Sequence, residues 1–131
     1  MNKQTSIKIM LGLLVAVIIF HLCIILKFIP YDIAWGGNLT NDNEMYVFEI
    51  ISVFINLLLC YVLLIKGEFV KGLIPLKIVD IFLWLFLVLF GLNTVGNAFA
   101  ETTFEKFFSI ITLLFVFLLW IILREKDSPK K

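Results

Sequence analysis

The sequence predicts an all-α fold, and more specifically a polytopic membrane protein built as an antiparallel four-helix transmembrane bundle. Of the 131 residues, 62% are hydrophobic and only 16% are charged, whereas an average soluble domain has about 45–50% apolar and about 25% charged residues. The apolar residues form four long runs, each close to the roughly 20 residues that a helix needs to cross the hydrocarbon core of a bilayer. Four such spans leave about 50 residues for tails and connections, so a separate soluble catalytic domain is excluded.

A single transmembrane domain covering residues 1–131 is expected, with spans approximately at residues 7–28, 45–65, 76–100 and 105–123. Pro30 ends the first span, because the residue before a proline is pushed out of the α region. Asn41-x-x-Glu44 and Thr102-x-x-Glu105 resemble the capping-box pattern and predict helix starts before the second and fourth spans. The connection between the third and fourth spans is short, so these two helices are expected to be antiparallel neighbours.

The basic residues predict the orientation of the chain. With both termini in the cytoplasm, nine of the 11 Lys and Arg residues lie on the inner side, and only Lys27 and Lys106 lie outside. Such an excess is typical of cytoplasmic segments. We therefore expect cytoplasmic N- and C-termini, and the Phe-, Ile-, Lys- and Asn-rich composition is compatible with a bacterial plasma (inner) membrane. A net charge of +1 is too small for nucleic-acid binding through a basic field, so the expected partner is the lipid bilayer and not a nucleic acid.

Polar residues within the spans gather in the half that this orientation places toward the outside. In the second span, Glu49, Ser52 and Asn56 are spaced three and four residues apart, so they lie on one helix face. Asn93 and Asn97, four residues apart, share a face of the third span. An ionised side chain at the centre of a span costs about 2.5–3.5 kcal/mol on insertion scales. These faces are therefore expected to turn toward one another or toward a water-filled cleft.

Glu49 is the strongest candidate for a functional residue. It has no Lys or Arg three or four residues away, and an intramembrane acid without a local partner indicates a functional site. His21 in the first span is the candidate partner, because an imidazole can change charge near neutral pH; a buried, satisfied histidine is the alternative. No paired spacing typical of a metal site is present, and the sequence identifies no cofactor and no catalytic residue. The candidate ligand-binding residues are Glu49, His21, Asn93, Asn97, Asn56 and Asp32.

Other residues have structural interpretations. Asp80 follows Lys77 by three residues, which predicts a local ion pair. Gly91 and Gly96 predict close contact between helices, either within the bundle or between protomers of a homo-oligomer. Four polar residues are of the type that forms hydrogen bonds between helices: Ser52, Asn56, Ser109 and Thr112.

Three functions stay open at this point. The favoured one is a polar, acidic recess on the extracytoplasmic half that binds a small cationic or polyhydroxy ligand, as part of a transporter, because a few polar groups in an otherwise apolar concave site are typical of binding. The second is a structural or accessory subunit of a membrane complex. The third is a membrane-embedded enzyme for a lipid-like substrate, with Glu49 as general base and His21 as acid or base. A cavity at these residues favours binding, mutual satisfaction without a cavity favours the accessory role, and a lateral opening to lipid favours the enzyme.

Overall fold

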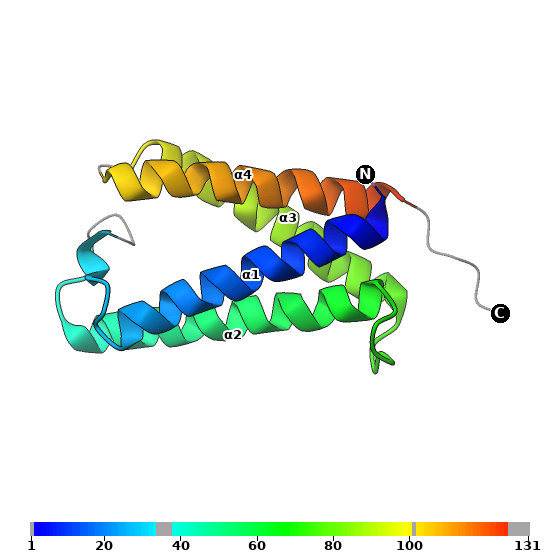
Figure 1. Ribbon diagram of the computed structural model, residues 1–131, viewed down its shortest axis with the longest axis horizontal. Coiled ribbons are helices and arrows are strands. Elements are labelled where there is room, and N and C mark those ends of the chain that lie inside the picture. Colours follow the sequence, from blue (N-terminus) through cyan, green and yellow to red (C-terminus); the bar gives the residue numbers. More distant parts are fainter. Residues whose placement is uncertain (1, 34–37, 101, 126–131) are drawn as a thin grey trace.

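The computed structural model describes residues 2–33, 38–100 and 102–125, and within these residues the chain is helical (Figure 1). The predicted all-α four-helix bundle is confirmed. All four α-helices are long and apolar enough to span a membrane, so the chain is a four-span integral membrane protein. In chain order the elements are α1 Lys3–Ile25, the short 3-10 helix η1 Tyr31–Ile33, α2 Asp42–Lys66, α3 Leu76–Ala98 and α4 Thr103–Arg124.

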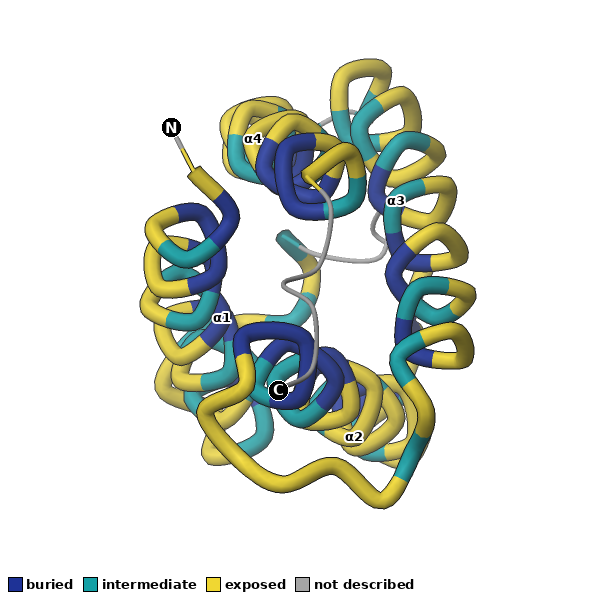
Figure 2. The backbone as a smooth tube through the Cα atoms, turned by 90° about the vertical axis from the view of Figure 1, so that its right-hand side faces the viewer, coloured by how far each residue is buried: buried dark blue, intermediate teal, exposed yellow. Residues whose placement is uncertain are grey.

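The helices form a closed ring in chain order, as the end-on view of Figure 2 shows. α3 packs most extensively against α4, and α1 against α2, while α1–α4 and α2–α3 contacts complete the ring. The predicted antiparallel pairing of the third and fourth helices is therefore confirmed. The two ends of the described chain meet at one end of the bundle (Figure 1), where the backbone N–H of Lys3 donates to the Glu125 carboxylate. We call the opposite half, with the C-terminal ends of α1 and α3, the distal half.

Side-chain caps determine where the helices begin. Asn41 Oδ1 accepts from the backbone N–H of Glu44 at 2.9 Å, and Thr102 Oγ1 accepts from that of Glu105 at 3.2 Å, so both predicted caps are present. A third cap was not predicted: Asn2 Oδ1 accepts from the backbone N–H of Thr5 at 2.8 Å. Because this cap satisfies an N–H of the first turn, α1 begins at Lys3 and not near residue 7.

In each of the connections that follow α1 and α2, the second residue is left-handed and is not glycine. Lys27 has φ 64° and Glu68 has φ 61°. The hydrogen bonds at Glu68 are those of a Schellman motif, since its N–H donates to the carbonyl of Ile65 at 3.0 Å and that of the next residue donates to Leu64 at 2.9 Å. Gly67 precedes the left-handed position and serves close packing instead, because a Cβ there would lie 2.7 Å from the Phe69 ring.

The main apolar core lies in the half nearer the chain termini. It is formed by the N-terminal halves of α1 and α3 and the C-terminal halves of α2 and α4, with Met10, Leu63, Leu83 and Leu118 at its centre, all fully buried. A smaller cluster around Ile24, Leu39 and Met45 lies under the connection between α1 and α2. Between these clusters the four helices do not close on a continuous apolar core, and this is where the polar side chains lie.

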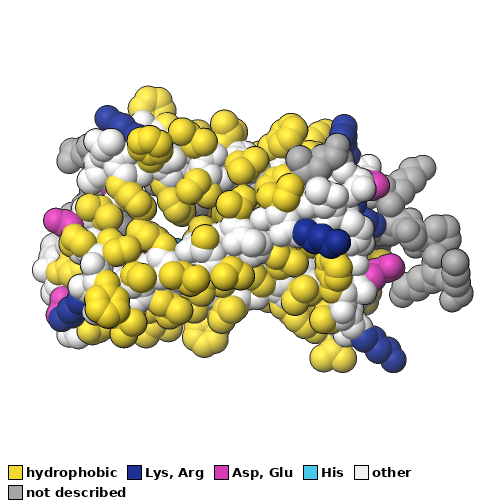
Figure 3. Space-filling view, viewed as in Figure 1, with side chains coloured by type: hydrophobic (Ala, Val, Ile, Leu, Met, Phe, Trp, Pro, Cys, Tyr) yellow, Lys and Arg dark blue, Asp and Glu magenta, His cyan; other side chains and the backbone are white. Residues whose placement is uncertain are grey.

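Large hydrophobic side chains cover the outside of the bundle on every helix (Figure 3). Exposed examples are Val15, Phe54, Leu85 and Phe107, one from each helix. Such a surface suits a bilayer, whose hydrocarbon makes no demand for polar groups. The structure thus associates the chain with lipid through all four helices.

The structure contradicts one structural prediction and one of the two alternatives of another. Asp80 forms its ion pair across helices with Lys66, Nζ to Oδ1 2.7 Å, instead of locally with Lys77. Lys66 is almost fully buried, and the ends of α2 and α3 meet here, so packing between helices decides the partner. Gly91 and Gly96 do not mark close contacts within the bundle, because a Cβ at either position would meet no atom within 4 Å.

Candidate functional site

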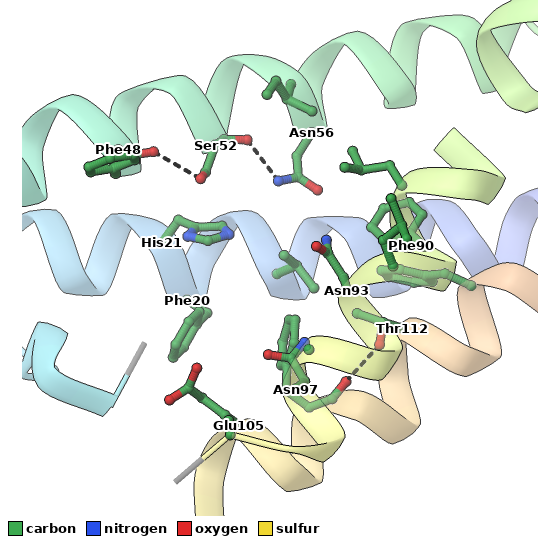
Figure 4. Close-up of a pocket in the computed structure, with 18 of the residues that line it drawn as sticks. Phe20, His21, Phe48, Ser52, Asn56, Phe90, Asn93, Asn97, Glu105 and Thr112 are labelled. Carbon is green, nitrogen blue, oxygen red and sulfur yellow. Dashed lines mark hydrogen bonds between the residues drawn. The ribbon is translucent and has the colours of Figure 1, made fainter. Parts of the chain in front are cut away.

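A cavity of about 700 Å³ lies between the four helices in the distal half (Figure 4). Its volume falls within the about 300–1,000 Å³ that is typical of small-molecule sites. Most of its lining is apolar, and Phe90 and Phe115, whose ring centroids are 4.9 Å apart, belong both to this lining and to the main apolar core. Polar side chains from each helix and from the α1–α2 connection reach it: His21, Asn38, Ser52, Asn56, Asn93, Asn97, Glu105 and Thr112.

The predicted contact between Glu49 and His21 is present. His21 Nδ1 and Glu49 Oε2 are 2.5 Å apart, which joins α1 to α2. The Glu49 side chain is fully buried, whereas 14% of the His21 side chain is exposed. His21 lines the cavity and Glu49 does not, so the imidazole stands between the carboxylate and the cavity. Because Nδ1 donates to the carboxylate, the neutral imidazole keeps Nε2 as an acceptor.

The amides of α2 and α3 meet the cavity in different ways. Asn56 points from α2 toward the cavity (Figure 4) and donates from Nδ2 to the Ser52 carbonyl of its own helix at 2.7 Å. Ser52 likewise donates to its own helix, to the Phe48 carbonyl at 2.9 Å. The side chains of Asn93 and Asn97 line the cavity and have no hydrogen-bond partner among the described residues. Two amides of α3 are therefore available to water or to a polar ligand group.

Polar residues of α4 complete the lining. Thr94 of α3 donates to Thr112 Oγ1 at 2.9 Å, a hydrogen bond between helices as predicted for Thr112. Ser52, Asn56 and Ser109, for which the same was predicted, donate instead to carbonyls of their own helices. This difference reflects the short reach of Ser and Asn side chains, which the carbonyl about one turn earlier satisfies.

Glu105 lines the cavity although it was not among the candidate ligand-binding residues. Its position was assigned to a helix cap, and it does cap: Thr102 Oγ1 donates to its Oε1 at 2.8 Å. Its side chain is also 94% buried within the chain and points into the cavity below Phe20 (Figure 4). The signal that indicated it is the spacing to Thr112, seven residues or about two helical turns, which puts both on the face of α4 that lines the cavity.

Asp32 is placed elsewhere. It lies on η1, is exposed, and is not among the residues that line the cavity. The neighbouring Ile33 does line it, and the Ile33 carbonyl accepts from Thr102 Oγ1 at 3.3 Å. A role for Asp32 therefore stays a prediction to which this arrangement adds nothing.

The charges around the cavity are predominantly acidic. Glu105 lines it directly, and Glu49 lies behind His21. Among the described lining residues there is no Lys or Arg. Three phenylalanines, Phe20, Phe104 and Phe108, form stacked pairs along one wall with centroid distances between 5.0 and 6.1 Å. Carboxylate, amides and aromatic faces together are groups that attract a cation or a hydroxylated molecule.

Fold and composition define the class of the protein, a four-span integral membrane protein. No protein-family model matches the sequence, and neither the curated proteins nor the solved structures gave a significant match. Within the described residues, no group of three His, Cys, Asp or Glu side chains is close enough to hold a metal ion.

Proposed function

We propose that this membrane protein binds a small cationic or polyhydroxy ligand in the cavity of its distal half, and that this half faces the extracytoplasmic side. The observation that carries the proposal is the pair of amides, Asn93 and Asn97, that line the cavity without a hydrogen-bond partner among the described residues. Asn93 is exposed and Asn97 is half-buried within the chain, so both amides are open to a binding partner, and the hydrocarbon of a bilayer cannot supply their missing hydrogen bonds. A polar ligand or water can.

Charge favours a cation over an anion. Glu105 faces the cavity and Glu49 supports His21 from behind, while the described lining contains no basic Lys or Arg. An ammonium group near Glu105 would gain a charge-assisted hydrogen bond, and the faces of Phe20 and Phe104 would add cation–π attraction. An anion would meet repulsion from the same groups.

The apolar core beside the cavity favours binding over open passage. Phe90 and Phe115 line the cavity and belong to this core, which occupies the half nearer the termini. Among the described residues, the core offers no polar route through that half. Movement of a ligand across the bilayer would need these helices to rearrange. We therefore propose a binding role, which suits a transporter component, and assign no catalytic step to Glu49 or His21.

The test is thermal stabilisation of the purified protein by tetramethylammonium, with sorbitol as the polyhydroxy probe. A bound ligand at 100 times its Kd stabilises the folded state by about 2.7 kcal/mol. Glu105→Gln removes the charge but retains a residue that suits a capping box. Tetramethylammonium has no N–H, so its attraction to Glu105 is coulombic, and unit charges 4 Å apart attract by about 1 kcal/mol in water and about 4 kcal/mol near a protein surface. This variant should therefore bind tetramethylammonium roughly tenfold more weakly.

Glu44→Gln is the matched control, because Glu44 occupies the same capping position at the start of α2 and does not line the cavity. It should retain the stabilisation. A variant that combines Asn93→Leu with Asn97→Leu should no longer be stabilised by sorbitol. If neither probe stabilises the native protein, or if Glu44→Gln and Glu105→Gln respond alike, the binding proposal fails and the accessory-subunit interpretation replaces it.

A further inference from the structure

A second hollow lies on the outside of the bundle, between α1 and α4. It has a volume of about 520 Å³ and is lined by α1 from Leu13 to Phe20 and by α4 from Thr103 to Ile111. Thr103 is its one polar lining side chain among the described residues. Figure 3 shows the surface hollowed between these helices, among hydrophobic side chains. We call this hollow the α1–α4 groove.

The α1–α4 groove and the polar cavity share one wall. Val17, Phe20, Phe104 and Phe108 line both spaces. Phe20 stacks on Phe104 at 5.0 Å and on Phe108 at 6.1 Å, so the wall is one layer of side chains, mostly aromatic rings. One side of this layer faces polar groups, and the other side faces the region that bilayer hydrocarbon occupies around a membrane-spanning helix.

We propose that the ligand is amphipathic: a long-chain ammonium compound whose hydrocarbon chain lies in the α1–α4 groove and whose ammonium group lies on the cavity side of the aromatic wall, near Glu105. This inference rests on the proposed binding function and specifies the class of its ligand. The hydrocarbon chain of the ligand would lie in an apolar groove, and its ammonium group would lie in a cavity that contains the acidic and amide groups.

The aromatic wall would separate the hydrocarbon chain of the ligand from its ammonium group. A carbon chain packs against the outer faces of Phe20, Phe104 and Phe108, while a cation at their inner faces gains attraction from the ring electrons. Among the described residues, the groove is lined by α1 and α4 alone, so it is open to the membrane plane, and rotation of these rings would connect it to the cavity. The ligand would therefore enter from the membrane plane, through the kind of lateral opening that the sequence analysis linked to an enzyme for a lipid-like substrate.

The experiment uses the protein in phosphatidylcholine nanodiscs and two photoreactive probes. One is hexadecylamine with a diazirine in its chain, and the other is hexadecanol with the same diazirine. The amine should label the groove segments of α1 and α4 in preference to the other lipid-facing surfaces, and roughly tenfold more than the alcohol, because the alcohol lacks the charge that meets Glu105.

Two groove-filling variants provide independent tests. Ala16 lines the groove but not the cavity, so Ala16→Phe should reduce amine labelling roughly tenfold, and Val15→Phe, next to it on the lipid face, should not. Ile110→Trp fills the groove from α4, with Leu113→Trp as its exposed control. This second pair keeps the test valid if one variant misfolds. Glu105→Gln should reduce labelling by the amine to the level of the alcohol.

The outcomes distinguish this inference from the proposed function. If tetramethylammonium stabilises the protein but the amine labels all lipid-facing surfaces alike, the cavity binds cations and the amphiphile inference is wrong. Equal labelling of the groove by amine and alcohol shows an unselective lipid contact and also overturns it. Absence of groove labelling by either probe means that a second copy or another protein covers the groove, which overturns it as well. If tetramethylammonium does not stabilise the protein but sorbitol does, the cavity binds polyhydroxy ligands and the amphiphile inference is wrong; if neither probe stabilises it, both proposals fail.

Discussion

The contact between His21 and Glu49 should be one of the strongest tertiary interactions in the bundle. The two atoms are 2.5 Å apart, and the Glu49 side chain is fully buried. Removing one partner of a buried, hydrogen-bonded pair typically costs about 3–5 kcal/mol, because the other group stays buried without it. We expect His21→Leu to lower the free energy of unfolding by about 3 kcal/mol, since Glu49 has a further interaction within the chain.

A double-mutant cycle isolates this pair from other effects of the substitutions. His21→Leu, Glu49→Leu and the double variant should give a coupling free energy of roughly 1.5–3 kcal/mol, the range for a hydrogen bond to a charged group. Unfolding can be followed by tryptophan fluorescence, because Trp84 of α3 and Trp120 of α4 are in edge-to-face contact at 6.1 Å. The same cycle with Ser109→Ala in place of Glu49→Leu is the control. A coupling below about 0.5 kcal/mol, the level of independent sites, would refute the pairing.

Two further predictions concern the connections that follow α1 and α2. Glu68→Gly should raise the free energy of unfolding by about 0.5–1 kcal/mol. A left-handed residue other than glycine costs about 1–2 kcal/mol, and replacing it with glycine removes this cost but adds about 0.5–1 kcal/mol in lost chain entropy. Glu68→Ala, measured by the same fluorescence assay, should not raise the free energy of unfolding. The hydrogen bond and charge of Asp42 hold the pKa of Lys27 above its ordinary value of 10.5, so this ion pair contributes below that pH and its contribution is lost as the pH rises through the raised pKa. Asp42→Asn should return the Lys27 pKa toward 10.5 in an NMR titration, and an unchanged pKa would contradict the assigned cause.

The sequence was sufficient for the architecture because each span is specified locally. Runs of about 20 apolar residues can only be helices in a bilayer, and the caps at Asn41 and Thr102 are read from residues three positions apart. The polar half could also be predicted from the sequence, since Asn93 and Asn97 share a helix face whatever the helix packs against.

Pairings between side chains of different helices were harder to predict from the sequence, because they depend on how each helix is rotated about its axis. Glu49 was expected at the recess, but the rotation of α1 and α2 places His21 between the carboxylate and the cavity. Asp80 was given a local partner although the end of α2 brings Lys66 closer. Glu105 was left out of the candidate site because its capping role is a complete local explanation, while its place at the cavity depends on the other three helices.

The central claim is that Asn93 lies in a cavity that opens to the extracytoplasmic side and takes up a cation. The direct measurement is thiol labelling of an Asn93→Cys variant, with Cys23 and Cys60 replaced by alanine, using a membrane-impermeant maleimide added outside intact cells. The account predicts labelling from outside that tetramethylammonium slows, while Phe54→Cys on the lipid-facing surface of α2 stays unlabelled. Labelling of Asn93→Cys only after the membrane is opened, or labelling that tetramethylammonium leaves unchanged, would contradict it.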